Sequence, residues 1–227
     1  MNFTTAKIFI SAMSFLTFLT GCAPTEVENA GMISGTFIGI DEETPIMLRS
    51  FKNGSLIKVA QCMSGVDGSF SITPEKPLRQ GYHQIIIDKR WPIVLITDST
   101  EAPIVSASVP DGKGYILNST ITGSASSELL ASYYGELMPK QDSLMLLQNS
   151  IRTLSSADKT AATKILNRLI IELENLSLEF IKANSESPAT LAALENLSPE
   201  KNAVAYKSVL KSLSKTYADS HYYTMLK

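Results

Sequence analysis

The stretch ITGSASSELL, residues 121–130, marks the point at which the chain changes its pattern. Before it, from Gly31 to Thr122, short runs rich in Ile, Val, Leu, Phe and Thr alternate with turn residues. After it, apolar residues recur at helical spacing, and Gly135 is the only glycine. Alternating runs favour strands, whereas a period near 3.6 favours helices. The stretch therefore predicts a junction between a strand region and a helical region near Gly123 and Ser124.

Eight short strands are predicted before the junction, at residues 32–40, 45–51, 55–62, 69–73, 81–88, 92–97, 103–108 and 114–122. Asn-Gly and Asp-Gly pairs at 53–54, 67–68 and 111–112 supply the positive-φ positions that tight hairpins need. Prolines fall at the proposed strand ends, where a missing amide proton does least harm. Short antiparallel strands at this spacing indicate a sandwich or a curled sheet.

Helices are predicted after the junction. Ser126 or Ser127 opens a first helix to about Met138, and Pro139 begins another at its first turn. Ser156 caps a long helix to about residue 184. One face of that helix carries an apolar stripe, which we expect to be buried as core: Ile165, Leu169, Leu173, Leu176 and Phe180.

Two shorter helices are predicted at 187–196 and 198–214. The second of them has five residues expected to face inward: Ala203, Tyr206, Leu210, Leu213 and Tyr217. The fold class expected is α+β, an antiparallel β-sandwich-like N-terminal half followed by an α-helical C-terminal half.

Composition excludes several functions. The chain has 227 residues, 44% of them hydrophobic, which is enough for a core and too many for a disordered chain. Its formal charge of −2 gives no basic field to hold nucleic acid. Two cysteines cannot form a disulfide framework or a four-cysteine zinc site.

The first residues predict a lipoprotein signal. Lys7 and the amino terminus precede an uncharged apolar run, residues 8–19, which is too short and too rich in Ser and Thr for a spanning helix. The run ends in Leu-Thr-Gly-Cys, residues 19–22, which resembles the lipobox of bacterial lipoproteins. Residues 1–21 are therefore expected to be removed and Cys22 to be acylated, as with palmitate. Several acyl chains would anchor the chain stably in a membrane.

The expected domain order follows from these patterns. A signal peptide at 1–21 precedes a polar tether at 22–30, a β domain at 31–123 and a helical region at 124–227. The expected location is the cell envelope, lipid-anchored to the outer membrane. Glu26 and Glu28 only loosely match the acidic signal of surface lipoproteins in Bacteroidota, so both a periplasmic and a surface-facing position stay open.

With these elements in order, the chain resembles the N-terminal domain of unknown function of Bacteroidota lipoproteins in the thioredoxin-like, AhpC/TSA-related group. The resemblance covers the chain from about residue 31 onward. It rests on five strings in the family's order: ISGTF from Ile33, PIMLRSF from Pro45, DGSFSI from Asp67, PLRQGYHQI from Pro77 and ITGSASSELL from Ile121. A sixth string, FIKANSESPATLAAL from Phe180, resembles the family's linker helices.

The resemblance does not carry an activity over. In the family this region is commonly followed by a thioredoxin fold with a Cys-x-x-Cys pair, whose first thiol attacks disulfides. The chain ends at Lys227, where that domain would start, and it contains no such pair. No catalytic residue is therefore transferred, and no enzyme activity is expected.

The remaining reactive side chains favour structural roles. Cys62 lies in an apolar strand and is expected to be a buried small hydrophobe, although a mixed disulfide with a partner is open to it. His83 and His221 have no spacing that suggests a shared metal. The acidic run at 41–43 lacks the ligand pattern of a calcium loop. Trp91, beside Lys89 and Arg90, is expected to be a core-edge anchor rather than a recognition residue.

Two functional hypotheses follow. In the first, the chain is a non-catalytic lipoprotein with a binding or scaffold role. Its partner is an unknown envelope protein or a small ligand, bound on the sheet face or at the junction of sheet and helices. In the second, it is an accessory module that docks a separately encoded thioredoxin-like partner. Neither hypothesis involves a cofactor, a metal or nucleic acid.

Overall fold

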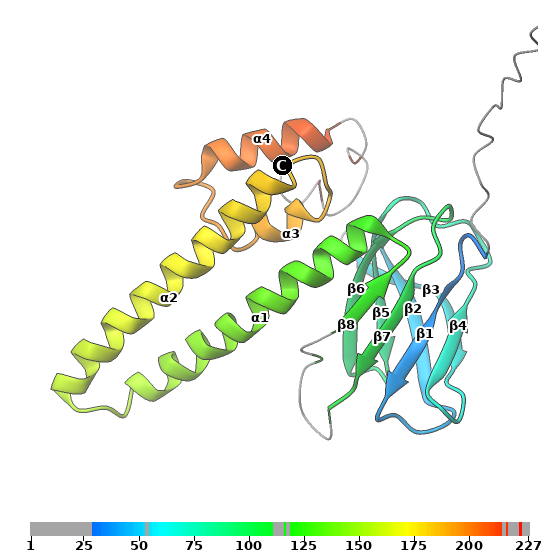
Figure 1. Cartoon of the computed structure of the whole chain (residues 1–227), viewed down its shortest axis with the longest axis horizontal. Helices are drawn as coiled ribbons and strands as arrows, with labels where there is room; N and C mark the ends of the chain where they lie inside the picture. The colour runs from blue at the N-terminus through cyan, green and yellow to red at the C-terminus, as the bar shows by residue number, and fades with distance from the viewer. Residues whose placement is uncertain are drawn as a thin grey trace, which may run out of the picture.

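The computed structural model describes residues 29–52, 55–110, 116, 119–214, 217 and 223. Two four-stranded sheets form a sandwich, and four helices follow it in the chain (Figure 1). The first sheet has the order β4 (Ser69–Ile72), β1 (Ile33–Ile38), β7 (Ile104–Ser108) and β8 (Ser119–Thr122). The second has the order β3 (Ser55–Met63), β2 (Pro45–Lys52), β5 (Gly81–Ile87) and β6 (Trp91–Thr97). The predicted α+β class is confirmed.

The pairing departs from the expected antiparallel pattern at one place. β1 and β7 run parallel, with Gly35 opposite Val105. Between these two strands the chain crosses to the second sheet and returns, and such a long connection permits a parallel pair. All the other described pairs are antiparallel. Part of the predicted eighth strand, at 114–115 and 117–118, lies outside the described residues.

The inner faces of the two sheets form one apolar core. It includes Phe37, which stacks on Phe70 with ring centroids 4.6 Å apart. Gly35 lies between β4 and β7, and a Cβ placed on it would lie 1.7 Å from the carbonyl oxygen of Val105. The glycine of the ISGTF string is thus required by a close approach of two strands.

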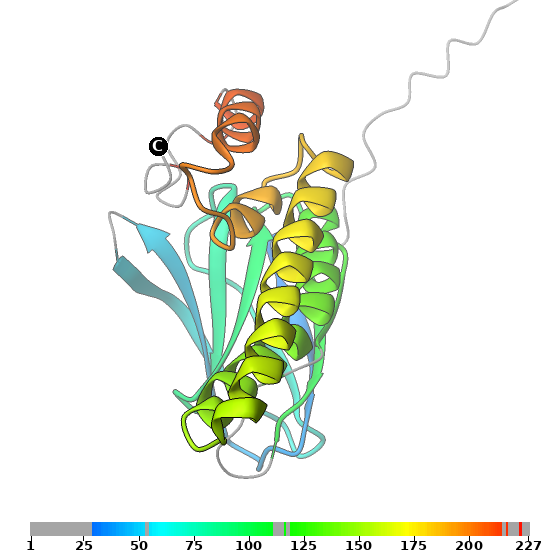
Figure 2. The same ribbon diagram turned by 90° about the vertical axis from the view of Figure 1, so that its left-hand side faces the viewer.

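Strand β5 of the second sheet is covered on both faces. Six of the seven β5 residues are buried, so the strand does not show the alternation of a half-exposed strand. Tyr82 and Ile96 belong to a second core, which is otherwise made by the helices. The helices therefore form a third layer on the outer side of β5 and β6 (Figure 2).

The helices are α1 (Ala125–Ile151), α2 (Ser156–Ala183), α3 (Thr190–Leu194) and α4 (Ala203–Leu213). The expected break at Pro139 was wrong, because α1 continues through it. Leu137 before the proline is buried and Leu144 after it packs against the helical core, so burial on both sides holds the helix together. The cap of α2 is Ser155, one residue before the predicted Ser156.

The apolar stripe predicted on the long helix is only partly buried. Leu173 is 8% exposed, whereas Ile165 is 43% exposed. The reason is that α1 and α2 pair as a hairpin that extends away from the sandwich, and only its near half meets α3 and α4 (Figure 1). In α4, Leu213 is buried as predicted, but Ala203 is exposed and Val209 takes its place in the core.

Candidate functional site

The hairpin of α1 and α2 is fixed to the sandwich through the edge of β6. The hydroxyl of Ser127 accepts a hydrogen bond from the Ile96 N–H at 2.9 Å and donates to the Ile96 carbonyl at 2.8 Å. Ser124, the N-cap of α1, also donates to that carbonyl, at 2.7 Å. Two serines thus supply the partners that a neighbouring strand would give. The predicted helix start at Ser126 or Ser127 was wrong, because the N-cap of α1 is Ser124, and the role of Ser124 and Ser127 at a strand edge was missed.

Beyond this contact, the open side of the sandwich holds a cavity of about 270 Å³. Most of its lining residues come from β6, β8 and α1, and Figure 1 shows the start of α1 following directly after β8. We call it the junction cavity and define it by its described lining residues: Pro92, Ile93, Val94, Ile116, Ser119, Ile121, Ala131, Tyr134, Gly135 and Met138.

None of the described lining residues of the junction cavity carries a charge. Ile93 and Ile121 form its buried floor, at 5% and 4% exposure. The α1 residues occupy positions 131, 134, 135 and 138, which lie on one face of a helix. A Cβ placed on Gly135 would meet no atom within 4 Å, so this glycine borders open space. In the sequence, Gly135 stands out as the only glycine of the helical region, but no local pattern assigns it a role.

Tyrosine hydroxyls join the helical layer internally and to the second sheet. The Tyr133 hydroxyl contacts Ser177 Oγ at 2.9 Å and accepts from Asn196 Nδ2 at 3.0 Å. The Tyr82 hydroxyl donates to the Pro188 carbonyl at 2.6 Å. Burial raises the pKa of Tyr82, and burial followed by repulsion from Glu195 raises that of Tyr134. These hydroxyls therefore stay protonated and act as hydrogen-bonding groups, not as bases.

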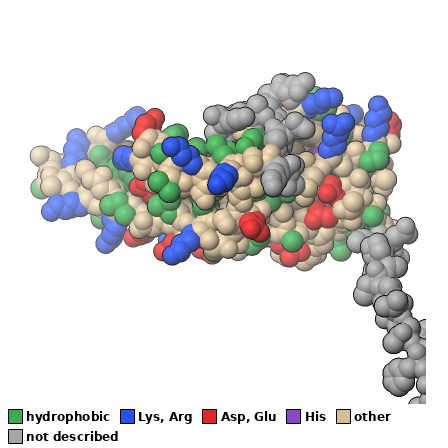
Figure 3. All heavy atoms as spheres, turned by 90° about the horizontal axis from the view of Figure 1, so that it is seen from above, with side chains coloured by type: hydrophobic (Ala, Val, Ile, Leu, Met, Phe, Trp, Pro, Cys, Tyr) green, Lys and Arg blue, Asp and Glu red, His purple; other side chains and the backbone are tan. Residues whose placement is uncertain are grey.

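A second hollow, of about 550 Å³, lies between the end of α2 and the start of α4. We call it the α2–α4 groove. Leu178 and Ile181 lie in it, Lys182 and Lys201 line it, and Val204 is 83% exposed. The groove is an open surface feature. Along the hairpin, basic and hydrophobic side chains are interspersed over the surface seen in Figure 3.

His83 is a structural residue of the second sheet. Its Nε2 contacts the carbonyl oxygens of Arg79 and Thr97, each at 3.1 Å, and therefore carries a proton. Its Nδ1 lies 2.8 Å from the Ser50 hydroxyl. Burial lowers the pKa of His83, so the ring is neutral near pH 7. His221 lies outside the described residues.

Cys62 lies at the end of β3 that faces β4. Its side chain is half-buried and packs against the sandwich core. Burial raises the pKa of the thiol, while a hydrogen bond with the Ser71 backbone opposes that shift. A raised pKa reduces the thiolate fraction, which is the nucleophilic form. Cys22, the expected lipidation site, lies outside the described residues.

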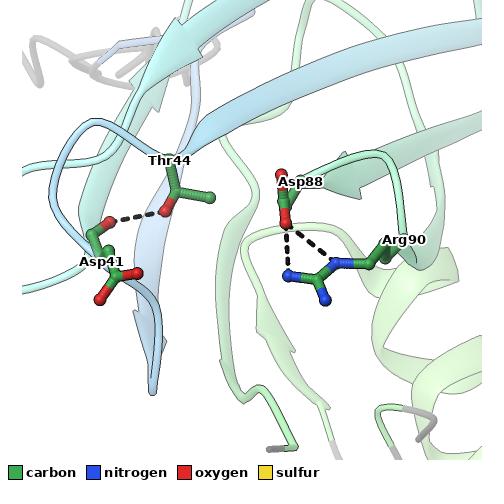
Figure 4. A network of polar contacts seen from close by, with 4 residues as sticks. All are labelled: Asp41, Thr44, Asp88 and Arg90. Carbon is green, nitrogen blue, oxygen red and sulfur yellow. Dashed lines mark hydrogen bonds and ion pairs between the residues drawn. The ribbon is translucent and has the colours of Figure 1, made fainter. Parts of the chain in front are cut away.

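The acidic run at 41–43 forms an ordered turn. The Thr44 hydroxyl donates to the Asp41 carbonyl at 2.7 Å (Figure 4). The Ser64 hydroxyl donates to the same carbonyl at 2.8 Å. Among the residues that the structure describes, no group of three His, Cys, Asp or Glu side chains could hold a metal ion.

At the turn after β5, Arg90 donates to the Asp88 carboxylate (Figure 4). The Arg90 guanidinium also lies over the Trp91 ring, 4.1 Å from its centroid. Trp91 is 6% exposed and belongs to the sandwich core, as expected for an anchor.

Within the described part of the chain, no helix has the length and apolar character needed to cross a membrane.

Comparisons with known proteins add no family. No family model matches the chain, and no curated protein matches it. Among solved structures, the 9R-lipoxygenase from Cyanothece PCC8801 is similar at 7% identity with a TM-score of 0.25. The match covers 73% of this chain and 30% of that one, so the chain spans less than a third of the lipoxygenase. A similarity this weak carries no argument about fold or function.

Proposed function

We propose that this chain is a lipid-anchored protein of the cell envelope that acts by binding a small ligand rather than by catalysis. The observation that carries the binding part is the junction cavity, a space between β6, β8 and α1 whose described lining residues carry no charge. Apolar clefts at the junction of packed layers are the usual sites of small ligands. The sheet–helix junction is also one of the two places where sequence analysis put the ligand.

The anchoring part of the proposal is supported by sequence. Leu-Thr-Gly-Cys at 19–22 follows an uncharged apolar run, and the polar residues after Cys22 suit a tether. Acyl chains on Cys22 would each contribute about 0.8 kcal/mol per buried methylene, and more than one chain gives stable anchoring. The membrane is then a partner through lipid alone.

The anchoring part is tested by replacing Cys22 with Ala. Labelled palmitate should enter the wild-type protein and not Cys22→Ala, and only the wild type should stay with membranes after a carbonate wash. Cys62→Ala is the matched control, because it removes the other cysteine and should keep both label and membrane association. A Cys22→Ala protein that remains in washed membranes would overturn the lipid anchor.

The second hypothesis, an accessory of a thiol-disulfide system, makes a different prediction. It requires Cys62, or a surface near it, to meet a thioredoxin-like partner. The raised pKa of Cys62 favours the ligand-binding proposal, because the thiol is mostly protonated near pH 7. An insulin-reduction assay separates the ligand-binding proposal from the accessory hypothesis. If the chain stimulates disulfide reduction by a thioredoxin-like partner, and Cys62→Ala does not, the accessory role is supported.

A further inference from the structure

We propose that the junction cavity takes a small uncharged molecule with an apolar body, such as a bicyclic aromatic compound, and that Gly135 keeps the space open for it. This inference rests on the proposed function and names the ligand class of the same site. It follows from the charge of the lining, the volume of the cavity, the polar edge of β6 and the position of Gly135.

The lining determines the charge of the ligand. No described lining residue is charged, and Ser119 and Tyr134 are the described lining residues with polar side chains. An ion placed against such a lining loses its hydration without gaining a counter-charge, which is costly. Carboxylates, phosphates and amines are therefore disfavoured.

The volume determines the size of the ligand. An apolar cavity of roughly 150 Å³ stays dry and accepts benzene. The junction cavity, at about 270 Å³, has room for a larger group such as two fused rings. Its floor of Ile93 and Ile121 provides apolar contact, which contributes roughly 25 cal/mol per Å² buried.

The edge of β6 supplies a polar contact. Ile96 directs its N–H and carbonyl away from β5, toward Ser127. Because this orientation repeats every second residue, Val94 directs its N–H and carbonyl to the same edge, and Val94 lines the cavity. A ligand with one hydroxyl or carbonyl group can therefore pair with Val94 while its apolar body occupies the cavity.

Gly135 determines how much space remains. A glycine inside a helix costs about 1 kcal/mol relative to alanine. Gly135 has no steric need to be a glycine, because a Cβ there meets no atom within 4 Å. A larger side chain at this position would project into the cavity, since Gly135 shares a helix face with Ala131 and Met138.

The test uses the full chain and two probes with the same ring system. 1-Naphthol is uncharged with one hydroxyl, and 1-naphthoate is its anionic counterpart. The lipidated protein is placed in lipid nanodiscs, and protein-free nanodiscs serve as the blank for partitioning. Binding is measured by isothermal titration calorimetry. If Cys22 proves not to be acylated, the same titration is made with the chain in buffer.

We expect 1-naphthol to bind one site per chain and 1-naphthoate to bind at least about tenfold more weakly. Gly135→Leu should weaken 1-naphthol binding by at least about tenfold, because its side chain occupies the cavity. Gly135→Ala should stay within about threefold of the wild type, since a methyl group removes little volume. Ser208→Leu, which places the same side chain in the α2–α4 groove, should also leave binding unchanged.

Thermal melting shows whether Gly135→Leu remains folded. If that variant does not fold, Ala131→Met is used instead, because it fills the cavity from another position of α1. The inference is overturned if 1-naphthol does not bind, if folded cavity-filling variants bind it as the wild type does, or if 1-naphthoate binds equally well. Failure of the anchoring proposal is separate: it would appear as a Cys22 without lipid, and the titration would be unaffected.

Discussion

The core of the sandwich and the junction with the helices are built in different ways. The core of the sandwich is a cluster of apolar side chains, and its strands approach so closely that Gly35 has no room for a methyl group. The junction is held by hydroxyl groups of Ser124, Ser127 and Tyr82, and it leaves space beside Gly135. Close packing specifies the fold, whereas the looser, polar-bonded region provides room for a ligand.

The same substitution at two glycines gives the sharpest form of this comparison. Gly35→Ala should have the largest effect, because the new Cβ would lie 1.7 Å from the Val105 carbonyl oxygen and no side-chain movement relieves the clash. We expect a loss of about 4 kcal/mol or more in the free energy of unfolding, or failure to fold. Urea denaturation followed by circular dichroism measures it. A near-neutral result would contradict the close approach of β1 and β7.

The serine contact at the β6 edge should have the next largest effect. Ser127→Ala leaves the Ile96 N–H without its partner in a buried position, which costs about 1–3 kcal/mol of stability. Ser126→Ala is the matched control, because Ser126 is only partly buried and should change stability by less than about 0.5 kcal/mol. Equal effects of the two substitutions in urea denaturation would show that the hydroxyl of Ser127 does not hold the edge.

Lowering the pH should destabilise the protein through His83, which is buried in the second sheet. Burial lowers its pKa below the ordinary 6.5, so below about pH 6.5 the unfolded chain binds a proton that the folded chain does not. The free energy of unfolding therefore falls as the pH drops from 6.5 toward the lower pKa of folded His83. The slope of this free energy against pH corresponds to the uptake of at most one proton. His83→Gln should remove this part of the slope. Unfolding free energies of both proteins at pH 7 and pH 5 measure it, and identical slopes would contradict the assignment.

The smallest expected change in stability is a gain, at Gly135. Gly135→Ala should stabilise the protein by about 0.5–1 kcal/mol, because alanine is the better helix former and its methyl group meets open space. The measurement is the same urea denaturation used for Gly35→Ala. A loss of stability would mean that other atoms fill the space beside Gly135. That result would contradict the junction cavity.

The local fold was largely predictable from sequence. Strand positions followed from short runs bounded by turn residues, and the change of class at Gly123 and Ser124 coincides with the end of β8 and the cap of α1. These features depend on residues close together in the chain, so local sequence patterns predict them.

Features that depend on distant residues were not predictable. The continuity of α1 through Pro139 depends on packing against α2, and the exposure of Ile165 depends on how far the hairpin extends beyond the sheets. A stripe of apolar residues shows that a face is suited to burial, not how much of it is covered.

The candidate site was predicted only by its place in the fold. A cleft at the sheet–helix junction was expected on general grounds, but its lining comes from three separate elements, β6, β8 and α1. Gly135 was visible as an isolated glycine in a helical region, which is a signal of a special position. Its meaning depends on the neighbouring edges of β6 and β8, which no local pattern describes.

Methyl NMR spectroscopy of the full chain, titrated with 1-naphthol, tests the central claim most directly. Binding in the junction cavity should shift the methyl signals of Ile93, Ile121 and Met138, which line it, and leave those of Ile33 and Ile72 in the sandwich core unchanged. Shifts confined to Leu178 and Val204 would place the ligand in the α2–α4 groove instead. That result, or the absence of any shift, would contradict the account.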